Sequence, residues 1–185
     1  MSERAVIDWL DPNGRPEARL YSRWSPPAQQ IPALADFIAA HPHPDACGLA
    51  DYRAWVTEHA PHLITAVTAP TAPEPAAAIA YRYTVQTNPL RIVAQTYRHE
   101  RWETSTTTGS PGELFAAAAQ LLAAQALRVR ALTEAFPRPP YAAHLASPHA
   151  LEAAAVRHEA NAAAAGWWPD EHPDHAPLDP THSEQ

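Results

Sequence analysis

The sequence contains no lysine, one cysteine and only five glycines among its 185 residues. A single cysteine cannot form a disulfide within the chain, and secreted proteins of this size usually carry cysteines in pairs. The few glycines form neither the Gly-x-Gly-x-x-Gly pattern of dinucleotide-binding proteins nor the Gly-x-x-x-x-Gly-Lys-Ser/Thr pattern of the P-loop. The chain also lacks an apolar run of about 18 residues, a basic-then-apolar leader and Asn-x-Ser/Thr sequons. Together these absences predict a cytoplasmic protein with no membrane partner.

All 13 basic side chains are arginines, and asparagine is scarce while alanine and proline are abundant. A genome rich in G and C produces this bias, because lysine and asparagine codons are rich in A and T. The composition therefore predicts a high-GC bacterial source, and the arginines alone do not predict nucleic-acid binding.

The net charge of −7 is unevenly distributed along the chain. Residues 170–185 hold five acidic residues and no arginine, so the rest of the chain carries 15 acidic and 13 basic residues. A body that is close to neutral disfavours strong non-specific binding to nucleic-acid phosphates, which needs several uncompensated cations.

Hydrophobic spacing and turn residues predict both strands and helices in this chain. The expected strands are Arg4–Leu10, Ala18–Trp24, Leu63–Thr68, Ala78–Thr87 and Leu90–Thr104. The expected helices are residues 30–40, 49–59, 111–136 and 148–165. The longest helix has the clearest start, because Ser110 can cap it, Pro111 suits its first position and Glu113 can bond back to Ser110. Its expected buried face comprises Leu114, Ala118, Leu121, Leu122, Gln125, Val129, Leu132 and Phe136.

These elements predict an α+β two-layer sandwich, in which a mainly antiparallel sheet of about five strands carries helices on one face. Twice in the chain a hairpin leads through an Arg-Trp dipeptide, Arg23-Trp24 or Arg101-Trp102, to a helix that a proline begins. This order suggests a ββα pseudo-repeat, with chance similarity as the alternative. Residues 1–168 are expected to form a single domain with a helical insertion at about 45–62. Residues 169–185 are expected to form a disordered acidic tail rich in proline and histidine.

Arginine and tyrosine on one face of the sheet could stack the bases and hold the phosphates of a single-stranded nucleic acid. The residues that would do so are Arg19, Tyr21, Arg23, Arg82, Arg98 and Arg101. The slight negative charge of the body opposes this binding, so nucleic acid is an alternative partner rather than the leading one.

The polar segment Tyr97–Glu103 offers a second alternative, namely small-molecule binding or acid-base catalysis. On one continuous strand His99, Arg101 and Glu103 would share a face, where an imidazole and a carboxylate could exchange protons beside a guanidinium that holds an anion. An exposed hairpin end with charge pairs across its strands would produce the same residue pattern. No second motif completes such a site, and we assign no catalytic residue and no cofactor.

The loop residues His41, His43, Asp45 and Cys47 all have side chains that can bind metals. Their alternate spacing matches no zinc pattern, in which the ligands usually come as two close pairs. We therefore predict no metal site. A lone cysteine beside a helix start most often behaves as a small packed hydrophobe.

Trp167 and Trp168 follow the last helix, and two fully exposed indoles would be costly. They either pack back onto the domain or anchor a partner, because tryptophan is enriched at the energetic centres of interfaces. With an adequate core and no assembled catalytic site, the leading expectation is a non-enzymatic protein–protein interaction or regulatory protein. Its partner would be another protein or a second copy of the chain.

Overall fold

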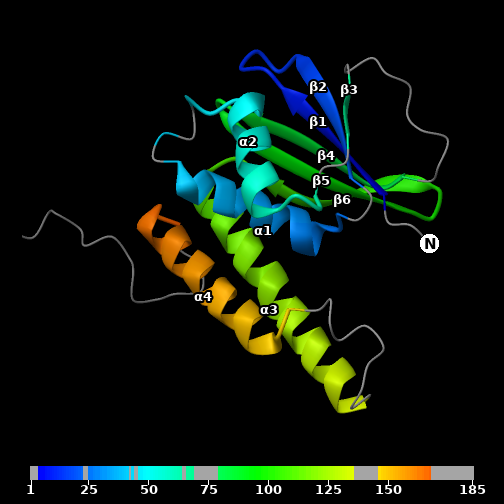
Figure 1. Cartoon of the computed structure of the whole chain (residues 1–185), viewed down its shortest axis with the longest axis vertical. Helices are drawn as coiled ribbons and strands as arrows, with labels where there is room; N and C mark the ends of the chain where they lie inside the picture. The colour runs from blue at the N-terminus through cyan, green and yellow to red at the C-terminus, as the bar shows by residue number, and fades with distance from the viewer. Residues whose placement is uncertain are drawn as a thin grey trace, which may run out of the picture.

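The computed structural model describes residues 4–22, 25–41, 43, 46–63, 66–68, 79–135 and 146–167. The strands are β1 (Arg4–Leu10), β2 (Pro16–Ser22), β3 (Ala66–Thr68), β4 (Ile79–Thr87), β5 (Leu90–Arg98) and β6 (Arg101–Thr108). The helices are α1 (Pro27–Ala40), α2 (Leu49–His59), α3 (Pro111–Ala135) and α4 (Pro148–Ala164). Helices α1 and α2 cover one face of the sheet, and the α3–α4 hairpin extends beyond it (Figure 1). The predicted α+β sandwich is confirmed.

The six strands form one sheet in the order β3-β2-β1-β4-β5-β6. All neighbouring strands pair antiparallel except β1 and β4, which pair in parallel at the centre. When β3 at the edge is left aside, the strand order is symmetric about β4, with hairpin β1–β2 on one side and the oppositely directed hairpin β5–β6 on the other. These hairpins continue into α1 and α3, which pack against each other. The fold thus contains two ββα units, with α2, β3 and β4 between them in the chain.

The main core lies between one face of the sheet and the helices. Side chains alternate along a strand, and Ile7, Trp9, Tyr83 and Val85 all belong to the buried core cluster. Asp8 points to the other face of the sheet, where it pairs with a residue of β2. This alternation explains why the helices gather on one side of the sheet.

Helix α2 is anchored to the core by aromatic rings. The ring of Tyr52 stacks on Trp9 with a centroid distance of 5.0 Å and meets Phe37 edge-on at 5.2 Å. Trp55 also meets Phe37 edge-on, at 6.0 Å. Because Trp9 belongs to β1 and Phe37 to α1, these rings join α2 to both layers of the sandwich.

A buried chain of hydrogen bonds reinforces the same region. The Ser25 hydroxyl donates to Gln30 Oε1 at 2.6 Å, and Gln30 Nε2 donates to the Tyr52 hydroxyl at 2.7 Å. The Tyr83 hydroxyl donates to the Ser25 carbonyl oxygen at 2.7 Å. Burial raises the pKa of Tyr52 well above its usual range, so its hydroxyl stays protonated. Each of these polar groups is satisfied inside the core, as buried polar groups must be to avoid a large penalty.

The prediction of one strand over Leu90–Thr104 is wrong. The chain reverses at His99 and Glu100, which both adopt left-handed backbone conformations with φ of 48° and 64°. Two-residue hairpin turns with positive φ usually contain asparagine, aspartate or glycine, and neither residue here belongs to that group. The segment is therefore the hairpin β5–β6, with a register shift in its middle.

The start of α3 follows the prediction in part. The Ser110 hydroxyl accepts from the Glu113 amide at 3.2 Å, which confirms the expected cap. The Glu113 carboxylate accepts from the Gly109 amide rather than bonding back to Ser110. Although α3 has 25 residues, no helix among the described residues combines the length and hydropathy needed to cross a bilayer.

Trp167 packs back onto the start of α3. It is half-buried and contacts the main core cluster. Gly112 leaves the space for it, since a Cβ atom at this glycine would lie 2.6 Å from Trp167 Cβ. Trp168 and the expected tail at 169–185 lie outside the described residues.

Candidate functional site

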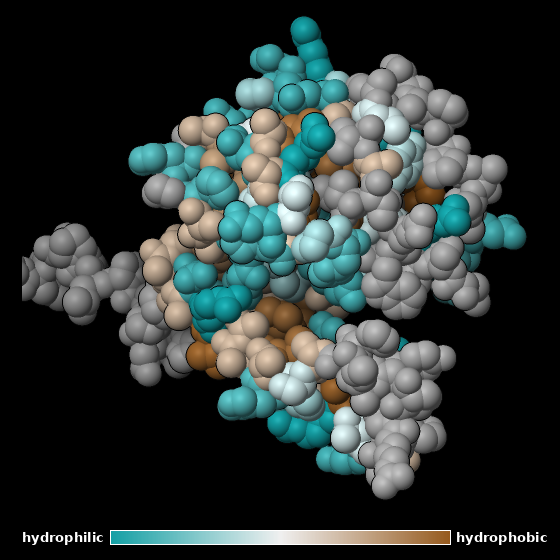
Figure 2. All heavy atoms as spheres, in the orientation of Figure 1, coloured by the Kyte–Doolittle hydropathy of each residue, from teal (hydrophilic) through white to brown (hydrophobic). Residues whose placement is uncertain are grey.

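A groove runs along α1 on the side that faces the α3–α4 hairpin. A hollow of about 610 Å³ lies between α1, the end of α2 and the α3–α4 hairpin. A second hollow of about 470 Å³ lies between the start of α1, β4 and α3. Both are lined by Ala28, Gln29 and Gln125, so they are continuous, and we call them together the α1 groove. Hydrophobic side chains are visible between the upper part of the molecule and the α3–α4 hairpin in Figure 2.

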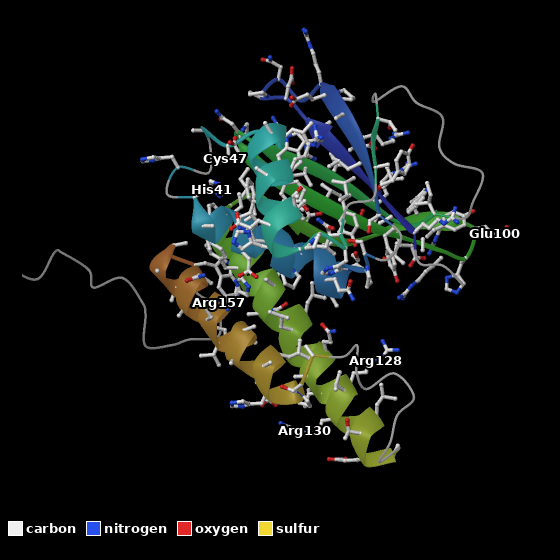
Figure 3. All side chains as sticks on the ribbon, viewed as in Figure 1. His41, Cys47, Glu100, Arg128, Arg130 and Arg157 are labelled. Carbon is white, nitrogen blue, oxygen red and sulfur yellow. The ribbon has the colours of Figure 1, made fainter. Side chains whose placement is uncertain are left out.

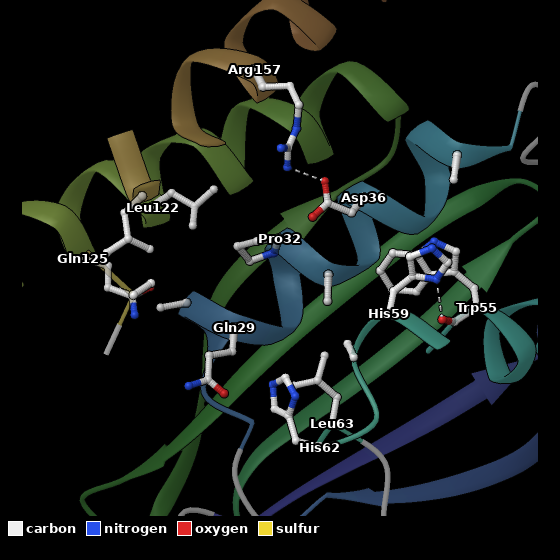
Figure 4. Close-up of a pocket in the computed structure, with 16 residues that line it drawn as sticks. Gln29, Pro32, Asp36, Trp55, His59, His62, Leu63, Leu122, Gln125 and Arg157 are labelled. Atoms are coloured by element: carbon white, nitrogen blue, oxygen red, sulfur yellow. Dashed lines mark hydrogen bonds and ion pairs between the residues drawn. The ribbon is translucent and has the colours of Figure 1, made fainter. Parts of the chain in front are cut away.

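The floor and walls of the first hollow include both polar and apolar residues, and the apolar ones come from several elements. They include Pro32 from α1, Leu63 from the segment after α2 and Leu122 from α3 (Figure 4), together with Leu151 from α4. These four residues are buried. Leu122 and Leu151 also belong to a small second core inside the α3–α4 hairpin. The hairpin therefore has its own packing and presents one wall of the groove.

Amide groups with unused hydrogen-bonding capacity lie where the two hollows join. Gln29 Oε1 is buried without a hydrogen-bond partner, and the Gln125 side chain forms no hydrogen bond within the described part of the chain. Pro32 lies inside α1 and has no amide hydrogen, so it cannot donate to the carbonyl of Ala28 one turn earlier. A buried acceptor without a partner costs about 1–3 kcal/mol, which a ligand that donates to it would recover.

Two imidazoles lie at one end of the groove. The His59 ring stacks on Trp55 with a centroid distance of 5.0 Å, and His59 Nδ1 lies 2.9 Å from the Trp55 carbonyl oxygen. Because a carbonyl only accepts, Nδ1 carries the proton, and Nε2 of the neutral ring is an acceptor. His62 is exposed on the following segment and lines the same hollow.

An ion pair beside a buried histidine forms the opposite wall. Arg157 Nη2 donates to Asp36 Oδ1 at 2.8 Å, and His158 Nε2 lies 3.4 Å from the same oxygen. The His158 side chain is 0 % exposed, and neither ring nitrogen has a hydrogen-bond partner. Its ring stacks against Phe115 of α3 at 6.1 Å. Burial lowers the pKa of His158, Asp36 opposes that shift, and the Arg157 charge adds to it.

Acidification is expected to destabilise the fold through His158. Its pKa in the folded chain lies below its ordinary value of 6.5, so the unfolded chain binds the proton more readily. The free energy of unfolding should therefore decrease as the pH falls below 6.5, by at most about 1.4 kcal/mol per pH unit. Urea unfolding between pH 8 and pH 5 measures this loss, and the variant His158→Phe should lose less.

The exposed His149 on the same helix provides the control for that experiment. The variant His149→Phe should keep the pH dependence of the original chain. Equal pH dependence of the free energy of unfolding in His158→Phe and the original chain would contradict the assignment.

The structure divides the residues predicted for nucleic-acid binding between the two faces of the sheet. Arg19, Tyr21 and Arg82 lie on the face opposite the helices, because each pairs with a β1 residue that points away from the core. Arg98 and Arg101 pair with each other across the β5–β6 hairpin and share the face of β5 that carries core residues. The expected common face therefore does not form.

Two arginines of the open face already have partners. Arg19 Nε donates to Asp8 Oδ1 at 2.6 Å, and both side chains are less than one-fifth exposed. The Arg82 guanidinium lies 4.8 Å from the ring centroid of Trp102. Arg23 lies outside the described residues. Single-stranded nucleic-acid binding stays a prediction, and these contacts reduce the charge available for it.

The segment Tyr97–Glu103, predicted as one strand, forms the end of the β5–β6 hairpin. Glu103 accepts from Arg101 Nε at 3.0 Å and lies 3.8 Å from His99, whose side chain is 83 % exposed. Figure 3 places Glu100 at the tip of this hairpin, on the far side of the view from the α1 groove. Arg101 and Glu103 both belong to β6 and His99 to the turn, so these pairs do not join β5 to β6 as the charges of an exposed hairpin end were expected to do.

The loop with four potential metal ligands has other contacts. His41 Nδ1 donates to the Phe37 carbonyl at 2.7 Å, and the buried Cys47 thiol lies 3.5 Å from the His43 carbonyl. Asp45 is outside the described residues. Among the residues that the structure does describe, no three potential ligands lie close enough together to hold a metal ion.

Sequence reasoning did not anticipate the α1 groove. Gln125 was expected on the buried face of its helix, and a glutamine on an otherwise apolar face was the one signal that pointed to this place. Gln29 and Asp36 carried no comparable signal. No protein-family model matches this sequence, and neither the curated proteins nor the solved structures contain a significant match to it.

Proposed function

We propose that this chain is a non-enzymatic protein-interaction module whose α1 groove binds an extended segment of a partner protein. The observation that carries the proposal is the pair of carboxamides, Gln29 and Gln125, which line both hollows, each of which also has apolar residues in its walls. A primary amide offers both donors and an acceptor, which complement the carbonyl and amide of an extended peptide backbone. Gln29 Oε1 is buried without a partner, and rotation of its side chain would present it as an acceptor for such a backbone amide.

The shape of the groove supports a chain segment as the occupant. Each hollow alone has the volume of a small-molecule pocket, for which about 300–1,000 Å³ is typical. The two hollows join end to end, so a compact ligand would fill one and leave the other empty. A peptide could bury apolar side chains in both hollows while its backbone crosses the two glutamines, as in other grooves that bind peptides.

A selection from a displayed library of random short peptides tests this function. Peptides enriched on the full chain are expected to bind at least tenfold more weakly, or by about 1.4 kcal/mol, to the variant Gln125→Trp. The indole would fill the junction of the two hollows. Binding is measured by fluorescence anisotropy with synthetic peptides.

Gln120 provides a matched control, because it lies on the same helix and is exposed outside the groove. The variant Gln120→Trp should bind the enriched peptides as the original chain does. The proposal fails if no peptide is enriched, or if both tryptophan variants bind the peptides equally well.

A further inference from the structure

Arginines outnumber carboxylates among the side chains that line the α1 groove. Arg157 lines the first hollow, and Arg128 lines the second. Among the described residues that line the two hollows, Asp36 is the one acidic side chain. The groove is therefore complementary to a segment that carries negative charge.

Arg157 has donors to spare for such a charge. Its side chain is 55 % exposed and bonds to Asp36 through Nη2, while a guanidinium carries five N–H donors in all. Figure 4 shows this guanidinium above α1 at the wall of the hollow. A carboxylate of a bound segment could accept two parallel hydrogen bonds from it, the geometry that makes arginine favourable for carboxylates.

His158 is a second potential ion-pair partner for the Asp36 carboxylate. Asp36 Oδ1 lies between Arg157 and His158, at 2.8 and 3.4 Å. His158 is fully buried, and both of its ring nitrogens lack a hydrogen-bond partner, although Nε2 lies 3.4 Å from Asp36 Oδ1. Phe115 of α3, whose ring stacks against His158, carries no charge. Burying an imidazole without a hydrogen-bond partner is costly. That cost would be recovered in a second conformation, in which the Asp36 carboxylate bonds to His158.

On the basis of the proposed function, we infer that the groove recognises an acidic side chain of the partner segment, which binds Arg157 while Asp36 turns to a protonated His158. The proton comes from solvent and is held on His158 Nε2, where it donates to Asp36 Oδ1. No charge is left unpaired in the complex, because the ligand carboxylate neutralises Arg157 and Asp36 neutralises the imidazolium. Binding therefore takes up one proton.

The exchange sets the direction of the pH dependence. In the free chain, burial and the Arg157 charge lower the pKa of His158 although Asp36 opposes them, whereas release of Asp36 from Arg157 to His158 in the complex raises it. Affinity for an acidic segment should rise as the pH falls through the pKa of the complex. It should level off below the pKa of the free chain, with a slope of at most tenfold per pH unit.

The test uses a peptide enriched in the selection described above and its analogue with glutamine in place of glutamate. On the original chain at pH 6 the acidic peptide should bind about tenfold more tightly than its analogue. The variant Arg157→Gln should remove that difference. The variant Arg130→Gln should retain it, because Arg130 is ion-paired with Glu152 and does not line the groove.

Proton uptake is measured on the original chain by titration calorimetry in two buffers of different ionisation enthalpy. Uptake of up to one proton per peptide is expected between the pKa of His158 in the free chain and its pKa in the complex, and the variant His158→Phe should take up none. Peptides that bind without an acidic residue, or without proton uptake, would overturn this inference while leaving the proposed function intact. If no peptide is enriched, both fail.

Discussion

Replacement of Trp9 by alanine should lower the free energy of unfolding by about 3–5 kcal/mol, the range for truncating a large buried aromatic residue. Trp9 is 1 % exposed and stacks on Tyr52, through which it joins β1 to α2. The stability of a domain is only about 5–15 kcal/mol in total, so this one change removes a large part of it. Urea unfolding followed by circular dichroism measures the loss.

The half-buried Trp102 provides the comparison for this prediction. It lies on the open face of the sheet, beside Tyr97 and under Arg82. The variant Trp102→Ala should cost much less than Trp9→Ala, because no core cavity is created. Similar losses for the two variants would show that Trp9 does not hold α2 in the way described.

Substitution of Gly112 by alanine should destabilise the chain by about 1–3 kcal/mol, the usual cost of overpacking. The new Cβ would lie 2.6 Å from Trp167 Cβ, a distance that real Cβ atoms do not reach, and neither atom can move by a side-chain rotation. The segment after α4 would have to leave its place against the core. Thermal and urea unfolding of the variant measure this cost.

The sign of the same substitution should reverse when Trp167 is first replaced by glycine. The clash is then absent, and alanine is favoured over glycine inside a helix by about 0.5–1 kcal/mol. A double-mutant cycle gives the coupling energy between the two positions. A destabilising Gly112→Ala effect in both backgrounds would show that the contact with Trp167 is not its cause.

The elements with strong local signals were predictable from the sequence. Arg4–Leu10 has the predicted bounds of β1, since a run of β-prone residues ends there at a turn that contains proline and glycine. Helix α3 begins at Pro111, after the predicted Ser110 cap. In these places the residues next to one another in the chain determine the structure.

The turn at His99 and Glu100 could not be predicted in this way. Neither residue favours positive φ, and the reversal depends on the ladder that β6 forms along β5. Missing this turn also placed side chains on the wrong faces. Tyr97 was expected on the same face as His99, Arg101 and Glu103. In the structure Tyr97 pairs with Trp102, so it lies on the opposite face of the hairpin from Arg101 and Glu103.

The α1 groove was unpredictable for a related reason. Gln29 and Gln125 belong to separate helices and line the same groove only when α1 packs on α3. Asp36 and Arg157 are 121 positions apart in the chain. Leu132, expected to be buried on α3, is 39 % exposed because α3 extends past the sheet that would cover it. Such features arise from tertiary packing, on which the local spacing of residues carries no information.

The parallel pairing of β1 with β4 at the centre of the sheet also bears on how quickly the protein can fold. Each hairpin pairs two strands that follow one another in the chain. The pairing of Ala5 with Tyr81, in contrast, closes a loop that contains β2, α1, α2 and β3. Closing so long a loop has an entropic cost that must be met before the strand contacts repay it, and chains rich in such distant contacts fold slowly. We therefore expect the joining of the two ββα units at β4 to be slower than the formation of either unit.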